Sequence, residues 1–180
     1  MREGRSQNDD MEEREMEEGE GGENVFEMLK TDHRHVQGLF TKFEDADKRA
    51  RGGIADETLT ALEVHAALEE ELVYPAIAEV IDDEELVNEA KEEHHVAKLL
   101  IKELRKMDAE DEGFSTKFKV LGELVGHHIE EEEGEMFPQA QEGGFEPESI
   151  SGEVSKRKAK LMQKYEGGKK SSGSRRKKAA

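Results

Sequence analysis

A repeated pattern of histidine and glutamate constrains the fold of this chain more than any other feature. Residues 65–75, HAALEEELVYP, and residues 128–138, HIEEEEGEMFP, each begin with histidine, carry glutamate four positions later and end on an aromatic residue and proline. Residues four apart on an α-helix lie on one face about one turn apart, so both side chains of each pair can reach the same point. The repeat therefore predicts two helices that each present a histidine and a glutamate to one place.

A second repeat supplies two further histidines. Residues 32–40, DHRHVQGLF, align with residues 93–101, EHHVAKLLI, and the alignment matches His33 to His94. The chain thus consists of two similar helical pairs, each with a lone histidine followed by an H-x-x-x-E segment.

Apolar residues at helical spacing predict four amphipathic helices. The expected helices run from about residue 25 to the stop at Gly52–Gly53, from Asp56 to about Ile81, from about 84 to 107, and from the polar connection around Gly113 to Gly143–Gly144. Short polar links between them predict an all-α fold, an antiparallel up-and-down four-helix bundle.

The segments around this bundle differ in charge. We expect a disordered acidic arm over 1–23, the helical domain over 24–145, an outer helix over 146–166 and a disordered basic tail over 167–180. The net charge is −7 over residues 1–23, −20 over 24–150 and +9 over 151–180. The basic tail either folds back on its own acidic body or binds a polyanion such as nucleic acid, which the body itself would repel.

Composition excludes several classes of protein. The 180 residues, 33% of them hydrophobic, can bury one compact core. No apolar run approaches the roughly 20 residues of a membrane span, and the N-terminus is acidic, so we expect a soluble, cytoplasmic protein. The absence of cysteine excludes thiolate ligands, so a metal would have to be held by imidazole and carboxylate, which suit iron, manganese or zinc.

Four histidines and two glutamates fall on the inward faces of the expected helices. Burying them without a cation would be costly, so the pattern favours a pair of metal ions over a metal-free polar core. The candidate ligands are His33, His65, Glu69, His94, His128 and Glu132.

The other three histidines are separated by helix face. His35 and His95 share their faces with polar or lysine residues, which predicts an exposed surface position. His127 shares its face with both apolar and charged residues, so it is a reserve ligand in place of His128.

Other polar and aromatic residues near the candidate ligands have simpler interpretations. Glu70 and Glu133 belong to a solvated face, although either could replace its neighbour as a ligand if the helix register shifts. Tyr74 and Phe137 are predicted to pack in the core, with Tyr74 a further reserve ligand. The proline after each aromatic residue is expected to kink or end its helix.

The four segments DHRHVQGLF, EVHAALEEELVYP, EEHHVAKLL and HHIEEEEGEMFP, in this order and spacing, resemble the hemerythrin-like HHE cation-binding domains over about residues 24–142. The resemblance implies a non-haem centre of two iron ions inside a four-helix bundle, with carboxylates bridging the irons; manganese or zinc is less expected. It carries the ligand role to the same six residues: His33, His65, Glu69, His94, His128 and Glu132.

The sequence departs from the oxygen-carrying hemerythrins at Lys98, where those proteins place a histidine one turn after the third-helix histidine. One donor fewer leaves exchangeable positions on the metals, which favours reaction with peroxide, dioxygen or nitric oxide over reversible oxygen carriage. Lys98 itself either donates to an acidic neighbour or an oxygen-derived ligand, or extends outward into solvent.

Three functions follow in order of preference. The first is a di-iron protein that senses, binds or detoxifies a small oxidant, with peroxidase-like or catalase-like turnover as its enzymatic form. The second is an iron-binding or iron-sensing module without turnover. The third is a metal-free helical interaction scaffold.

Overall fold

The structure is a computed structural model that describes residues 24–176, with side chains described up to residue 166. The expected acidic arm over 1–23 lies outside these residues. The described part is all helical and contains no strand, which confirms the predicted fold class. Its elements are α2 (Val25–Asp45), α3 (Lys48–Leu68), η1 (Glu69–Val73), α4 (Tyr74–Ile77), α5 (Glu84–Leu104), α6 (Glu112–Glu131), η2 (Glu132–Met136), α7 (Phe137–Glu142) and α8 (Ser151–Arg176).

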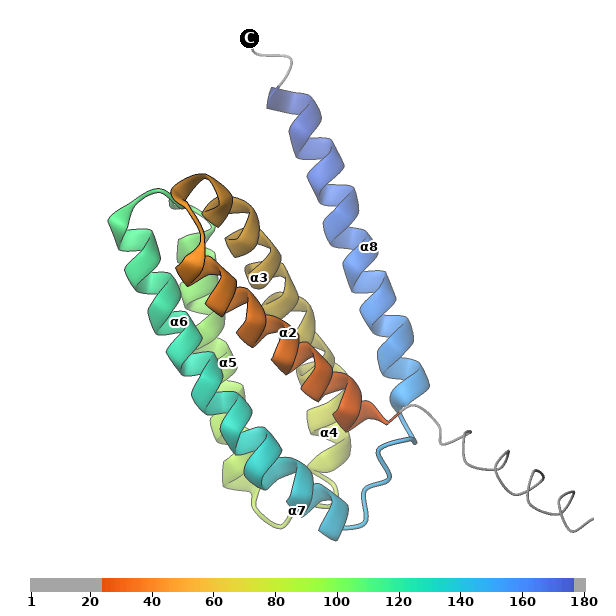
Figure 1. The fold of residues 1–180 in the computed structure, drawn as a ribbon. Coiled ribbons are helices and arrows are strands. Elements are labelled where there is room, and N and C mark those ends of the chain that lie inside the picture. The colour runs from red at the N-terminus through yellow and green to blue at the C-terminus, as the bar shows by residue number, and fades with distance from the viewer. Residues whose placement is uncertain (1–23, 177–180) are drawn as a thin grey trace, which may run out of the picture.

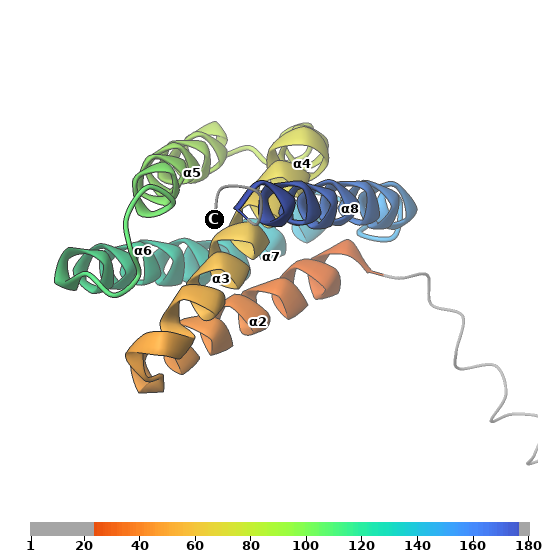
Figure 2. The same ribbon diagram turned by 90° about the horizontal axis from the view of Figure 1, so that it is seen from above.

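Four rods form the bundle. The first is α2, the second runs through α3, η1 and α4, the third is α5, and the fourth runs through α6, η2 and α7. Successive rods run in opposite directions, and Figures 1 and 2 show α2 beside α3 and α5 beside α6. The two halves found in the sequence repeat are therefore two helical hairpins that face one another.

The first connection differs from the prediction. Helix α2 ends at Asp45, and Asp47 caps α3 by accepting hydrogen bonds from the backbone N–H groups of Arg49 and Ala50, each at 3.0 Å. This cap starts a new helix before Gly52 and Gly53, which lie inside α3 and do not end α2 as expected. An aspartate N-cap contributes about 1 kcal/mol, which offsets much of the helical cost of a glycine.

Three other predicted boundaries also move. Helix α5 ends at Leu104 and not near 107. The second rod ends at Ile77, four residues before the predicted end at Ile81. Helix α6 begins at Glu112, so Gly113 lies in its first turn and not in the preceding connection. Helix ends carry weak sequence signals, because several neighbouring residues can close the last turn.

The prolines of the two repeats do not end their helices. Pro75 and Pro138 follow π-helical turns in which the N–H of Tyr74 donates to the carbonyl of Glu69, and that of Phe137 to the carbonyl of Glu132. A proline has no N–H and crowds the carbonyl four residues earlier, and the wider turn just before it accommodates both effects. The rods continue as α4 and α7, and both wide turns begin at candidate metal ligands.

Two apolar clusters fill the bundle, one on each side of the histidines. Along α2, for example, Leu29 belongs to one cluster, His33 follows one turn later, and Val36 belongs to the other. The same order of apolar, polar and apolar residues recurs in the other three rods. The polar side chains therefore occupy a layer sealed by apolar packing above and below.

Helix α8 forms a fifth rod that lies along α3 (Figure 1). Val154 and Leu161 are buried against the bundle, while Arg157 and Lys158 form ion pairs with acidic residues of the body. The helix extends to Arg176, well beyond the outer helix expected to end near 166 and into the segment where the sequence predicted a disordered tail. Both ion pairs involve residues of the expected outer helix, so the folding back of the basic tail over 167–180 stays a prediction, as does nucleic-acid binding.

No helix in the described part of the chain combines the length and apolar character needed to cross a membrane.

Gly143, which caps the end of α7, provides a test of how this end packs against the turn that follows α4. A Cβ at this position would overlap the backbone carbonyl oxygen of Val80. Gly143→Ala should therefore lower the free energy of unfolding by about 1–3 kcal/mol. Gly38→Ala is the matched control, because a Cβ there meets nothing within 4 Å, and this variant should be unchanged or up to about 1 kcal/mol more stable. Chemical denaturation of both variants measures the difference, and equal stabilities would contradict the predicted contact.

Candidate metal centre

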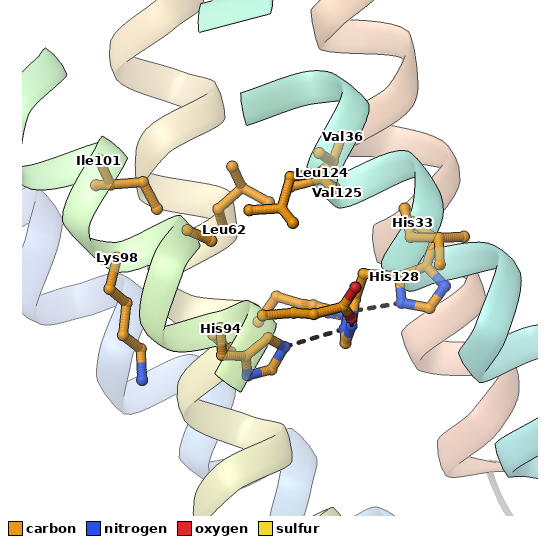
Figure 3. A pocket seen from close by; sticks show the side chains of 14 residues that line it. His33, Val36, Leu62, His94, Lys98, Ile101, Leu124, Val125 and His128 are labelled. Carbon is orange, nitrogen blue, oxygen red and sulfur yellow. Dashed lines mark hydrogen bonds and ion pairs between the residues drawn. The ribbon is translucent and has the colours of Figure 1, made fainter. Parts of the chain in front are cut away.

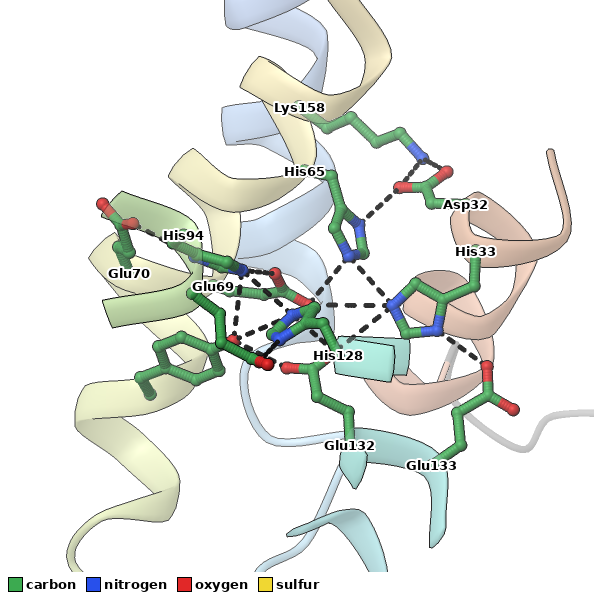
Figure 4. Close-up of polar contacts among 12 residues, drawn as sticks. Asp32, His33, His65, Glu69, Glu70, His94, His128, Glu132, Glu133 and Lys158 are labelled. Carbon is green, nitrogen blue, oxygen red and sulfur yellow. Dashed lines mark hydrogen bonds and ion pairs between the residues drawn. The ribbon is translucent and has the colours of Figure 1, made fainter. Parts of the chain in front are cut away.

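The structure brings all six predicted ligands into one buried layer (Figure 4). They come from all four rods of the bundle, and each is at most 6% exposed. The six are His33 from α2, His65 from α3, Glu69 from η1, His94 from α5, His128 from α6 and Glu132 from η2.

Four of these residues form a first group. The Nε2 atoms of His33 and His65 lie 2.9 Å apart. His65 Nε2 lies 2.9 Å from Glu69 Oε1, and His33 Nε2 lies 3.3 Å from Glu132 Oε2. All of these donor atoms lie within 4.8 Å of one another, close enough to share one cation.

A second group uses the other oxygen of Glu69. His94 Nε2 lies 3.4 Å from Glu69 Oε2 and 3.0 Å from His128 Nε2. Glu132 Oε2 lies 3.5 Å from His128 Nε2, so this glutamate also contacts both groups. Each carboxylate therefore stands between two pairs of imidazoles, one pair on each side.

Tyr74 lies within the second group. Its hydroxyl donates a 2.7 Å hydrogen bond to Glu132 Oε1, and its oxygen lies 3.4 Å from His94 Nε2 and 3.5 Å from His128 Nε2. The side chain is fully buried, as predicted for core packing, but its polar end faces the candidate ligands. The Tyr74 oxygen is therefore close enough to the second group to act as the reserve ligand that the sequence suggested.

The unpartnered oxygens of the two glutamates fit a cation. Both oxygens of Glu69 and Oε2 of Glu132 are buried and make no hydrogen bond with suitable geometry, although imidazole nitrogens lie nearby. A buried carboxylate without partners costs several kcal/mol, so such groups normally bind a metal or a charged partner. This set of nitrogen and oxygen donors suits iron, manganese or zinc.

Electrostatic interactions among the side chains of the layer are strong. Burial alone would favour the neutral forms, but the adjacent charges outweigh it. They raise the pKa of His65 to about 10 through Glu69 and Asp32, and they hold the pKa of Glu69 well below its usual value through His65 and His94. Burial and the charges of Glu69 and Glu132 raise the pKa of Tyr74.

The second ring nitrogen, Nδ1, of every histidine in the layer faces a carboxylate. These four residues, called the outer carboxylates below, are Asp32, Glu70, Glu93 and Glu133. His33 Nδ1 lies 2.7 Å from Glu133, His94 Nδ1 lies 3.0 Å from Glu70, and His128 Nδ1 lies 2.8 Å from Glu93. The corresponding distance from His65 Nδ1 to Asp32 is 3.7 Å, which is an ion-pair contact beyond hydrogen-bonding range. Carboxylates in this position orient metal-binding histidines and direct the Nε2 lone pair inward.

The outer carboxylates occupy equivalent positions in the two sequence repeats. The sequence analysis did not predict that they contact the histidines. Asp32 precedes His33 as Glu93 precedes His94, and Glu70 follows Glu69 as Glu133 follows Glu132. The carboxylate before each lone histidine contacts the second histidine of its own half: Asp32 contacts His65, and Glu93 contacts His128. The carboxylate after each inner glutamate contacts the lone histidine of the other half: Glu70 contacts His94, and Glu133 contacts His33. Glu70 and Glu133, interpreted as a solvated face, are outer partners of the ligands and not replacements for them.

The three remaining histidines lie outside the layer. His35 and His95 are exposed, as their helix faces predicted. His127 is also exposed and lies 3.2 Å from Glu131, so the structure does not bring this reserve residue to the six-residue group.

Lys98 lies at the edge of the layer (Figure 3). It contacts Glu70, the carboxylate that faces His94 (Figure 4). It is 43% exposed, so it both extends towards solvent and reaches an acidic neighbour. Lys98 therefore places a positive charge that is linked through Glu70 to His94 Nδ1.

A small cavity of about 30 Å³ adjoins the histidines (Figure 3). Its walls are mostly aliphatic and include Val36, Leu62, Ile101 and Val125, with Lys98 on one side. This volume holds one or two water-sized molecules. The cavity can therefore admit a diatomic molecule or a peroxide, but not an ordinary metabolite.

Removal of single histidines tests the assignment. His65→Ala or His128→Ala should sharply lower the metal content of the purified protein, because each removes a donor from one of the two groups. His35→Ala and His95→Ala should retain the wild-type content, because both residues are exposed. Elemental analysis of the four variants is the measurement, and metal loss in either surface variant would contradict the assignment.

Comparison with known proteins places the chain in a family. A sequence model of the hemerythrin HHE cation-binding domain matches residues 24–140. The fold is similar to a crystal structure of a hemerythrin HHE cation-binding domain-containing protein from Mycobacterium kansasii, with a TM-score of 0.65 and 25% identity over 78% of this chain and 86% of that one. No curated protein sequence matches the chain. Since the family match covers more than half of its length, the chain belongs to the hemerythrin HHE cation-binding domain family.

Proposed function

We propose that this protein binds two iron ions and reacts with a small oxidant, hydrogen peroxide foremost, with dioxygen and nitric oxide as other molecules of suitable size. The observation that carries the proposal is the sharing of Glu69 and Glu132 between two buried histidine pairs. A carboxylate placed in this way can bridge two ions, and facing helices of bundles are known hosts for such centres.

The donors divide into two sets. One ion would be held by His33 and His65, and the other by His94 and His128, with the two glutamates between them. Two six-coordinate ions require more donors than these six residues supply, even with Tyr74 added, so positions are left for an exchangeable ligand. Iron is preferred over manganese and zinc because of the family to which the chain belongs.

Bound iron would supply one-electron redox chemistry and open positions for the oxidant. The protein's own residues would select the oxidant and fix the ligands. The cavity of about 30 Å³ has room for one or two water-sized molecules, and its walls are mostly aliphatic. The Tyr74 hydroxyl places a proton donor beside Glu132 and the second histidine pair.

Peroxide turnover gives the direct test. Iron-loaded protein should convert two hydrogen peroxide molecules into one dioxygen and two water molecules, with a rate proportional to bound iron. Zinc-loaded protein should be inactive, because zinc undergoes no redox change. His128→Ala should lose roughly tenfold or more of the rate, whereas His35→Ala should not. An oxygen electrode and peroxide absorbance follow the reaction.

The result also separates the alternatives. Peroxide loss without oxygen release, dependent on an added reductant, would indicate peroxidase-like turnover. Iron-loaded protein that consumes peroxide no faster than its zinc-loaded form would contradict the preference for peroxide. If it also fails to react with dioxygen and nitric oxide, an iron-binding or iron-sensing module is favoured.

A further inference from the structure

Two lysines break the internal symmetry of the outer carboxylates. Asp32 and Glu93 are equivalent positions in the repeat, yet within the described residues only Asp32 forms an ion pair with a lysine, Lys158. Glu70 and Glu133 are equivalent in the same way, and only Glu70 has a lysine partner. Each histidine pair therefore has one outer carboxylate held by a cation and one that is not.

Lys158 comes from α8, which lies beyond the family match over residues 24–140. Its Nζ donates to both oxygens of Asp32, at 2.5 and 2.8 Å. Asp32 Oδ2 in turn lies 3.7 Å from His65 Nδ1, as the chain of dashed lines in Figure 4 shows. A residue of α8 is thus linked to a candidate ligand through a single carboxylate.

Asp32 lies farther from its histidine than the other three outer carboxylates do. The outer carboxylates of the other three histidines lie within hydrogen-bond range of their Nδ1 atoms, whereas Asp32 lies beyond it. His65 Nδ1 is buried and has no hydrogen-bond partner. Asp32 itself is 19% exposed, so without Lys158 its carboxylate could turn towards water.

The packing of α8 against the bundle holds Lys158 in its position. Val154 and Leu161, on either side of it in the sequence, are buried against the bundle. Both belong to the apolar cluster that also contains Leu29 and Leu68. The lysine therefore reaches Asp32 from a helix whose apolar face is anchored.

We propose that Lys158 is a positioning residue for the metal held by His33 and His65: it keeps Asp32 beside His65 Nδ1, so that α8 controls how firmly that one ion is bound. This inference rests on the proposed two-metal centre. Outer partners of metal-binding histidines typically contribute 10–100-fold to metal affinity. The ion held by His94 and His128 has its own lysine-held carboxylate, Glu70, and is independent of α8.

The neighbouring residue offers a matched control. Arg157 pairs with Glu71 through two contacts of 2.6 and 2.8 Å, so it also fastens α8 to the body. Glu71 is 45% exposed and has no contact with the six-residue layer among the described interactions. Arg157→Met should therefore weaken the docking of α8 much as Lys158→Met does, without moving Asp32.

The test uses the full chain loaded with two equivalents of cobalt(II), whose visible absorption reports ligand geometry. Lys158→Met should release one of its two ions to a chelator roughly 10–100-fold faster than wild type, with a changed cobalt spectrum. Lys158→Arg should restore both, and Arg157→Met should match wild type in both. Asp32→Asn should reproduce the fast release, which covers the case in which Lys158→Met fails to fold.

The outcomes separate the two proposals. Release of one ion accelerated equally in Lys158→Met and Arg157→Met would overturn the positioning role, since loosening of α8 alone would explain it. Wild-type release from Lys158→Met and Asp32→Asn would also overturn it while leaving the two-metal centre intact. A wild-type protein that binds no cobalt in the bundle would overturn the centre itself.

Discussion

The carboxylates of Glu69 and Glu132 lie fully buried between two apolar clusters, and the rest of the bundle depends on how their charge is balanced. Bringing two anions into such an interior costs several kcal/mol each. Four imidazoles surround them, yet three of their four oxygens still make no hydrogen bond. A pair of cations shared between the two carboxylates would satisfy those oxygens and replace the repulsion between them with attraction.

The duplicated helical hairpin explains how one centre can be assembled from two similar halves. Each half contributes two histidines, one inner glutamate and two outer carboxylates, and the equivalent residues occupy equivalent positions. Each inner glutamate begins a π-helical turn just ahead of a proline, so a backbone adjustment required by the proline coincides with the ligand. The lysines depart from this symmetry: Lys98 and Lys158 each contact one outer carboxylate of one histidine pair, and Lys158 comes from α8, outside the two repeated halves.

The fold and the inner residues were predictable because both follow from helical spacing. His33 and His94 lie on apolar faces, and the H-x-x-x-E pairs place each glutamate one turn beyond its histidine. The outer carboxylates were not found, since in a chain with 45 acidic residues a single glutamate carries little information. The alignment of the repeats matches Asp32 to Glu93 and Glu70 to Glu133, but it does not indicate which histidine each carboxylate faces. The contact between Lys158 and Asp32 depends on how α8 docks, and no local pattern encodes that geometry.

Metal titration followed by thermal unfolding tests the central claim most directly. The metal-free protein places two carboxylates close together without full compensation, so each bound ion should stabilise the fold by mass action. Adding ferrous iron without oxygen should raise the melting temperature until two equivalents per chain are bound, and chelation should reverse the rise. A melting temperature unchanged by iron, or one that saturates at a single equivalent, would contradict a shared two-metal centre.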